Sequence, residues 1–232
     1  MILQSIPEVG VGDPTSMPTV VVFDCESDGK PIRTGLHGEP DFTHVQCTVV
    51  CALVFDAKCL ATPESAAESL AAARKIICWR DVVPHESVGP FDELFTAFDR
   101  ADLIVGYNQL DFDFPLLRKY YGRSWSVDKY VSHRIKCLDV FQRVRCVLGY
   151  WPKLEYLLHV NGLAGKSGTG AEAITMWNDG RRKELQEYCE IDVLRTAQLA
   201  LLPEMRIDAR YTIPSFVYGI IPALATHTSP TS

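Results

Sequence analysis

The chain lacks several features that would assign it to a common class of protein. Its 232 residues contain no apolar run of roughly 18 residues, the length that a membrane-spanning helix needs, so we expect no membrane association. The N-terminus has no basic start followed by an apolar stretch, and a secretory signal is not expected. The eight cysteines include no Cys-x-x-Cys pair, which argues against zinc-ribbon and thioredoxin-like motifs. We therefore expect reduced thiols and an intracellular, reducing compartment, the cytoplasm or the nucleus.

An excess of basic residues is also missing. The formal net charge is −6, so the chain as a whole lacks the electrostatic signature of a nucleic-acid binder. An acidic balance does not exclude a nucleic-acid enzyme, because bound cations neutralise the carboxylates of a metal site. The composition, 47% hydrophobic and 22% charged, is typical of a globular enzyme. We predict a flexible segment at 1–17, one domain at 18–202, and a partly disordered C-terminal extension at 203–232.

Strand-like and helical patterns alternate along the chain and predict an α/β fold. Strands are expected at 19–24, 45–56, 76–79, 101–105 and 135–140. Helices are expected within 62–74, 91–98, 112–121 and 152–200, and a long loop at 27–44. This order predicts an antiparallel meander followed by right-handed parallel crossovers. The result is one mixed five-stranded sheet flanked by helices.

Two acidic residues stand at the end of the first predicted strand. Asp24 and Glu26 point to the same side of that strand, about 7 Å apart along the backbone, while Cys25 points to the other side. Two carboxylates on one face repel each other, and burying them is costly unless cations neutralise them. The alternative is a strand end whose acids face water.

Asp113 follows the fourth predicted strand and a Gly106-Tyr107-Asn108 turn. It stands near the start of the next helix, beside the carboxyl ends of the parallel strands, where ligand sites of open α/β sheets lie. The alternative is a helix cap, for which Asp111 is the better candidate. Phe112, between the two acids, is expected to anchor the segment.

Tyr188 and Asp192 are four residues apart on a predicted helix. They share a face, with Cβ atoms about 5–6 Å apart, beside the apolar stripe that includes Leu185 and Leu199. The alternative is a solvated surface pair. Taken with Asp24, Glu26 and Asp113, however, Asp192 completes a set of four hard oxygen donors. Such donors favour Mg²⁺ or Mn²⁺ over zinc, and two such ions can clamp the attacking and leaving oxygens of a displacement at phosphorus.

The three clusters resemble the motifs of the DEDD exonuclease superfamily, which has a ribonuclease H-like fold and trims nucleic acids from the 3′ end. Asp24 and Glu26 match its Asp-x-Glu motif, and Gly106, Asn108, Phe112 and Asp113 match the second motif. Tyr188 and Asp192 match the third motif of the tyrosine branch, since Glu187 stands where the other branch has histidine. The stretch from Leu163 to Val193 is similar to stand-alone relatives of the family B polymerase proofreading domain.

The resemblance implies a role for each matched residue. Asp24, Glu26, Asp113 and Asp192 would bind two divalent ions, Mg²⁺ or Mn²⁺, and Tyr188 would position the attacking water. Asn108 and Phe112 are assigned to substrate binding. The implied activity is 3′→5′ hydrolysis of single-stranded nucleic acid with a free 3′ end, DNA favoured over RNA, releasing nucleoside 5′-monophosphates. The sequence identifies no replication or repair protein as a partner.

A basic segment offers a surface for the substrate. Residues 116–145 contain eight Lys or Arg against two acids, with Tyr120, Tyr121, Trp125 and Tyr130 interleaved. Basic side chains contact phosphates and aromatic rings stack on bases, so this segment is predicted to form a strand-binding groove. Two alternatives to an exonuclease are a non-catalytic nucleic-acid-binding module and a ribonuclease H-like endonuclease.

Overall fold

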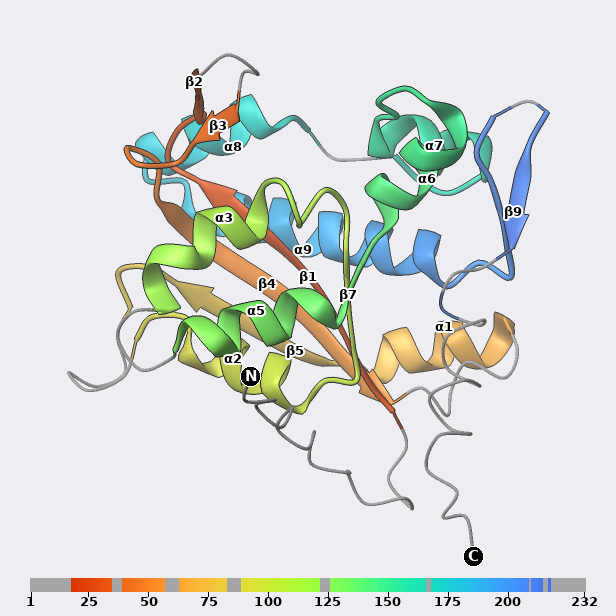
Figure 1. Ribbon diagram of the computed structural model, residues 1–232, viewed down its shortest axis with the longest axis horizontal. Helices are drawn as coiled ribbons and strands as arrows, with labels where there is room; N and C mark the ends of the chain where they lie inside the picture. The colour runs from red at the N-terminus through yellow and green to blue at the C-terminus, as the bar shows by residue number, and fades with distance from the viewer. Residues whose placement is uncertain are drawn as a thin grey trace, which may run out of the picture.

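The sheet of the protein is arranged around its first strand. In the computed structural model, which describes residues 18–34, 39–56, 63–82, 89–121, 126–165, 168–208, 210–214 and 217, five strands form one sheet. Its order is β5 (Arg74–Trp79), β4 (Cys47–Asp56), β1 (Thr19–Ser27), β6 (Leu103–Gly106) and β7 (Cys137–Asp139). β4 pairs antiparallel with β1 and β5, whereas β6 pairs parallel with β1 and β7. The predicted mixed sheet is therefore confirmed (Figure 1).

β1 is central because its apolar side chains are buried on both faces of the sheet. Val20 and Val22 belong to one core cluster, and Phe23 belongs to the other. Cys25 also lies in the second cluster, so Asp24 and Glu26 point to the face covered by the first. The predicted shared direction of these two acids is thus confirmed.

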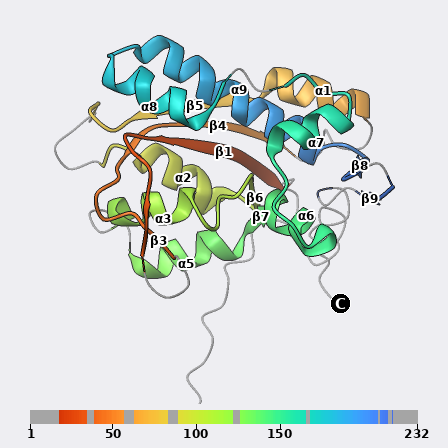
Figure 2. The same ribbon diagram turned by 90° about the horizontal axis from the view of Figure 1, so that it is seen from above.

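Helices cover both faces of the sheet, as Figure 2 shows. On one face lie α1 (Pro63–Ala72), α8 (Gly170–Asn178) and α9 (Arg182–Ala200). On the other lie α2 (Asp92–Arg100), α3 (Asp113–Leu117) with the 3-10 turn η2 (Arg118–Tyr120), and α5 (Val127–Ile135). α6 (Val140–Leu148) follows β7 directly, and α7 (Leu154–Val160) packs against α9.

α9 is the helix that spans the sheet, packing against β1 and β4. Apolar residues recur along it every four positions, which places them on one face. Leu185, Cys189, Val193 and Ala197 are all buried in the first core cluster. Tyr188 belongs to the same cluster, so the third motif lies against the sheet rather than on the surface.

Several element boundaries differ from those predicted. The segment 27–44, expected to be a loop, contains a small hairpin of β2 (Ile32–Thr34) and β3 (Glu39–Asp41). The fifth strand, predicted at 135–140, is shorter because Ile135 ends α5 and Val140 begins α6. The helix predicted at 112–121 is interrupted, since α3 continues as the 3-10 turn η2. Asp111 does not cap α3, whose N-cap position is Phe112.

Described residues after α9, which were predicted to belong to a C-terminal extension, pack on the core. β8 (Glu204–Arg206) and β9 (Thr212–Pro214) form a hairpin, and Met205, Ile207 and Val217 are buried in the first core cluster. The predicted flexible segment at 1–17 and, of the predicted extension at 203–232, residues 218–232 fall outside the described residues. Among the helices that the structure describes, none combines the length and the hydropathy needed to cross a membrane.

Candidate active site

The carboxyl end of β1 extends beyond its parallel neighbour. β6 pairs with β1 only from Val20 to Val22, so the part of β1 that carries Asp24 and Glu26 lies past the last β1–β6 pair. Glu26 is buried and Asp24 is partly buried. The strand therefore presents two carboxylates at the edge of the core, at the place where ligand sites of such sheets form.

Asp113 reaches this strand end from the opposite helical layer. Its Oδ1 accepts a hydrogen bond from the backbone N–H of Cys25 at 2.9 Å, and its side chain is buried. Burial raises the pKa of Asp113 to about 7, although the bond from Cys25 opposes that shift. A cation beside this carboxyl group would favour its charged form.

Tyr188 and Asp192 approach the same strand end from α9, and both are buried. Burial raises the pKa of Tyr188 above its ordinary value, and the carboxylates of Asp192, Glu26 and Asp24 raise it further. The phenol is therefore a stable hydroxyl surrounded by acids. It can donate a hydrogen bond, and because it stays neutral it adds no negative charge beside the carboxylates.

One cavity of about 440 Å³ joins these side chains. Its lining contains every residue that the sequence assigned to the site: Asp24, Glu26, Asn108, Phe112, Asp113, Tyr188 and Asp192. We refer to it as the acidic cavity. Lys30, the α8 N-cap Thr169 and the first two residues of α8, Gly170 and Ala171, also line it. These wall residues could not be predicted from the sequence, because no local pattern links them to the acids.

The donor set of the acidic cavity suits a hard cation. Carboxylate oxygens of Asp24 and Glu26 and the Sγ of Cys189 lie within 4.8 Å of one another. Burial raises the pKa of the Cys189 thiol well above its ordinary value, so this sulfur stays protonated and is a poor ligand. The oxygens that remain are ligands that Mg²⁺ and Mn²⁺ prefer. The residues present therefore fit the predicted metal type.

The turn between β6 and α3 is held by Asp139, the last residue of β7. Its carboxylate accepts hydrogen bonds from the backbone N–H groups of Asn108 and Leu110, each at 2.9 Å. Asn108 adopts a left-handed backbone conformation, with φ 67°. Gly106 has no room for a side chain, because an added Cβ would lie 2.0 Å from Oε1 of buried Gln109. Asp139 thus supports the wall of the cavity without lining it.

Within the described part of the basic segment 116–145, two of the tyrosines predicted to stack on bases are core residues. Tyr121 and Tyr130 are buried in the second core cluster, packed against each other with ring centroids 5.1 Å apart, so they cannot stack on bases. Lys136 donates to the backbone carbonyl of Asp99 at 2.9 Å, and Lys129 pairs with the Asp99 carboxylate. The prediction was wrong for these residues because the aromatic rings serve the core; Trp125 lies outside the described residues.

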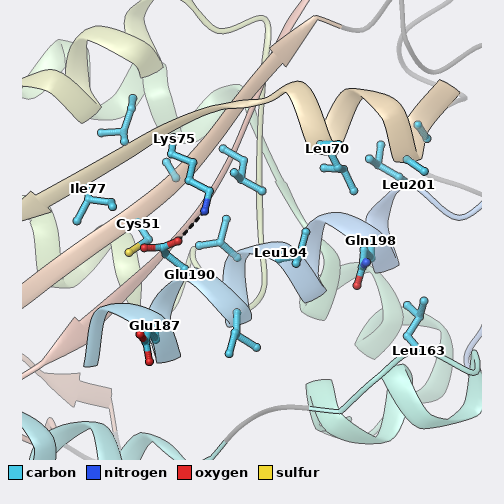
Figure 3. A pocket seen from close by; sticks show the side chains of 18 of the residues that line it. Cys51, Leu70, Lys75, Ile77, Leu163, Glu187, Glu190, Leu194, Gln198 and Leu201 are labelled. Carbon is cyan, nitrogen blue, oxygen red and sulfur yellow. Dashed lines mark hydrogen bonds and ion pairs between the residues drawn. The ribbon is translucent and has the colours of Figure 1, made fainter. Parts of the chain in front are cut away.

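A larger cavity, of about 840 Å³, lies between α1, β4, β5 and α9 (Figure 3). Leu70, Ile77 and Leu194 are among its apolar lining, and an ion pair joins Lys75 Nζ to Glu190 at 2.8 Å. Glu190 belongs to the third motif but points into this apolar cavity. α9 therefore separates two sites, and Glu190 is not part of the acidic cluster.

The strand order and connections define a ribonuclease H-like α/β fold. Residues 127–206, about a third of the chain, match the model of a family described as a predicted 3′-5′ exonuclease related to the exonuclease domain of PolB. The matched segment includes α9 with Tyr188 and Asp192. The resemblance to this class of exonuclease is thus confirmed, while its tyrosine branch stays a prediction. No curated protein matches the chain.

Solved structures resemble the chain at low sequence identity. The family B DNA polymerase of the archaeon Pyrobaculum calidifontis matches with a TM-score of 0.52 and 16% identity, over 79% of this chain and 24% of that one. A structure of exonuclease I matches with a TM-score of 0.49 and 14% identity, over 80% of this chain and 40% of that one. E. coli exonuclease I bound to a dT13 oligonucleotide matches with a TM-score of 0.46 and 15% identity, over 91% of this chain and 42% of that one. The chain thus spans less than half of each of these proteins.

Proposed function

We propose that the protein is a metal-dependent 3′→5′ exonuclease of the tyrosine branch, acting on the 3′ end of single-stranded DNA. The observation that carries this proposal is the convergence of Asp24, Glu26, Asp113, Tyr188 and Asp192 on one cavity. These residues come from β1, α3 and α9, three elements that are far apart in sequence. A packing requirement alone does not explain four acids at the edge of a core, because burying charge costs free energy.

Each residue of the cavity has a distinct task in this proposal. The four carboxylates would hold two divalent cations, which would supply positive charge to the attacking and leaving oxygens. The Tyr188 hydroxyl donates a hydrogen bond that orients the attacking water. Asn108 and Phe112 hold the terminal nucleotide, Phe112 being fixed by an edge contact with Phe42, ring centroids 5.5 Å apart. The product is a nucleoside 5′-monophosphate.

The walls of the cavity suit a substrate with a phosphate backbone. The first residues of α8 lie at the cavity, so the positive end of this helix dipole faces the space. A capping box of Thr169 and Glu172 fixes where the helix begins. Lys30 adds a cationic side chain to the lining. The helix dipole and Lys30 favour an anion beside carboxylates that would otherwise repel it.

The decisive experiment follows a 3′-labelled oligonucleotide incubated with the protein and Mg²⁺ or Mn²⁺, with and without chelator. We expect the label to leave the oligonucleotide as a mononucleotide, and its release to stop when the chelator is added. If no mononucleotide is released under any of these conditions, the protein is not a nuclease of this kind.

Two further substrates define the reaction. A circular single strand should stay intact, since the proposed reaction starts at a 3′ end; cutting it would identify an endonuclease instead. Matched deoxyribose and ribose oligomers compare DNA with RNA directly. We expect faster release from DNA, and faster release from RNA would overturn the stated preference.

A further inference from the structure

A series of aromatic rings leads from the acidic cavity to the surface. Tyr107 lines the cavity, and its ring packs against Phe141 of α6 with centroids 5.6 Å apart. Phe141 in turn packs against Trp151, centroids 5.3 Å apart. Trp151 lies in the segment between α6 and α7, and 60% of it is exposed. The series therefore ends on an open surface two ring contacts away from the cavity.

We propose that Trp151 and Arg145 form an outer binding site for an unpaired base of the strand whose 3′ end enters the acidic cavity. This inference rests on the proposed function. The occupant is single-stranded nucleic acid, because stacking on an indole ring requires a base whose face is not covered by a duplex partner. We call Trp151 and Arg145 the outer platform.

The charge around the outer platform suits a phosphate backbone. The guanidinium carbon of Arg145 lies 3.9 Å from the centroid of the Trp151 ring. Arg143 on α6 and Lys153 before α7 are also exposed, and residues 143–155 contain one acid, Glu155 on α7. An exposed cation–π contact is weaker than the stacking of a base on tryptophan. A base can thus replace the guanidinium on the ring, and Arg145 can then pair with a phosphate.

The segment carrying Trp151 is anchored to the wall of the cavity. The Tyr107 hydroxyl donates a hydrogen bond to the carbonyl oxygen of Pro152 at 3.0 Å, which ties the residue after Trp151 to the turn after β6. Pro152 itself is buried, and so is Leu154, the first residue of α7. The exposed ring is therefore held in place relative to the acidic cavity, and a bound base loses little to ordering the protein.

Another aromatic pair of the described residues is less suited to stacking. Trp79 and Trp177 face each other with centroids 6.5 Å apart, and Arg182 lies over both rings. Arg182 is also paired with Asp81 through two hydrogen bonds, the shorter 2.7 Å. Opening this pair would break an ion pair as well as the ring contacts. It serves to join β5 to the start of α9.

The test measures binding without cleavage. Fluorescence anisotropy of labelled dT12 and dT2 in chelator gives the dissociation constant for wild type, Trp151→Leu, Trp151→Phe and Tyr211→Ala. The dinucleotide is the shortest substrate with a scissile bond. Leucine keeps an apolar contact with Phe141 but offers no π face. Tyr211 is a matched control, being 56% exposed with Arg210 5.9 Å from its ring centre and outside the ring series.

We expect Trp151→Leu to weaken dT12 binding roughly tenfold while changing dT2 binding much less. Trp151→Phe should restore most of the dT12 affinity, and Tyr211→Ala should match the wild type. Unchanged dT12 binding in Trp151→Leu overturns the outer platform, as does an equal loss for both lengths. Because no cleavage is needed, this result is independent of the nucleotide-release assay, which alone decides the proposed function.

Discussion

Asp113 shows how one buried carboxylate can serve both the fold and the proposed chemistry. Its Oδ1 accepts the N–H of Cys25, and an asparagine can still accept that bond. We predict that Asp113→Asn lowers turnover by about 10²–10³-fold or more, because the neutral amide removes a charge that the cations need. Nucleotide release measures the loss, and urea unfolding verifies that the variant is folded. Wild-type turnover in a folded Asp113→Asn variant would remove Asp113 from the metal site.

Tyr188 differs from Asp113 because its ring is part of the core while its hydroxyl faces the acids. Tyr188→Phe keeps the ring and removes only the hydroxyl. We predict a loss of turnover of roughly 10–100-fold, smaller than for Asp113→Asn, since the hydroxyl orients a water molecule and binds no cation. The Mn²⁺ affinity should equal that of the wild type. A clear fall in Mn²⁺ affinity would show that the hydroxyl takes part in holding the metal.

At the scale of elements, the turn from β6 into α3 depends on a single acid from the neighbouring strand. Asp139 accepts backbone N–H bonds from Asn108 and Leu110, and a third from Gln142 at the start of α6, at 3.3 Å. We predict that Asp139→Ala lowers the free energy of unfolding by about 2–4 kcal/mol. It should also lower turnover, because Asn108 and Asp113 lose their support.

Asp139→Asn is the matched control for that prediction, since it keeps one acceptor oxygen and the size of the side chain. Its loss of stability in urea unfolding should be smaller than that of Asp139→Ala. If Asp139→Ala unfolds at the same urea concentration as the wild type, the turn is held by other contacts.

The elements also show what local sequence can predict. The alternation along β1 and the spacing of Tyr188 and Asp192 on α9 depend only on strand and helix geometry, so both were predicted correctly. A mixed sheet followed from the order of the elements. These features need no knowledge of distant neighbours.

The parts that were missed depend on contacts between distant segments. The rings of Tyr121 and Tyr130 resemble a stacking surface in sequence, and only the packing of α5 against α2 and α3 makes them core residues. Glu190 stands beside Tyr188 in sequence, yet it pairs with Lys75 across the apolar cavity. Lys30 and Thr169 reach the acidic cavity through loops whose course no periodicity reveals.

At the scale of the molecule, the layer of α2, α3 and α5 contains a buried histidine that makes its stability depend on pH. The Nδ1 of His133 is 2.9 Å from the Tyr121 hydroxyl, with the side chain fully buried. Burial lowers the pKa of His133 to about 4; Lys136 and Lys129 act in the same direction, and Asp99 opposes them. The unfolded chain therefore binds a proton at higher pH than the folded protein does.

We predict that this histidine lowers the free energy of unfolding as the pH falls from about 6.5 to about 4, by about 3 kcal/mol at most. Above about pH 6.5 the contribution of His133 to the free energy of unfolding is constant. His133→Gln keeps an acceptor for Tyr121 and does not titrate, so the difference between wild type and variant isolates the histidine. Urea unfolding at several pH values measures this difference. A difference that stays constant from pH 7 to pH 4 would contradict the prediction.

The acidic cavity also connects the sheet with the helical layers on both of its faces, because its carboxylates come from all three layers. Asp24 and Glu26 belong to the sheet, Asp113 to the α3 side and Asp192 to the α9 side. Cations bound between them should stabilise the whole fold. At a concentration of a hundred times its dissociation constant, Mn²⁺ adds about 2.7 kcal/mol to the free energy of unfolding, which raises Tm by roughly 5–10 °C.

We predict this rise in Tm for the wild type and for Glu187→Gln, because Glu187 is an exposed acid of α9 that lines the apolar cavity and not the acidic cavity. It should vanish when Asp24 and Asp192 are both changed to asparagine, and an equal rise in that variant would mean that the metal binds elsewhere.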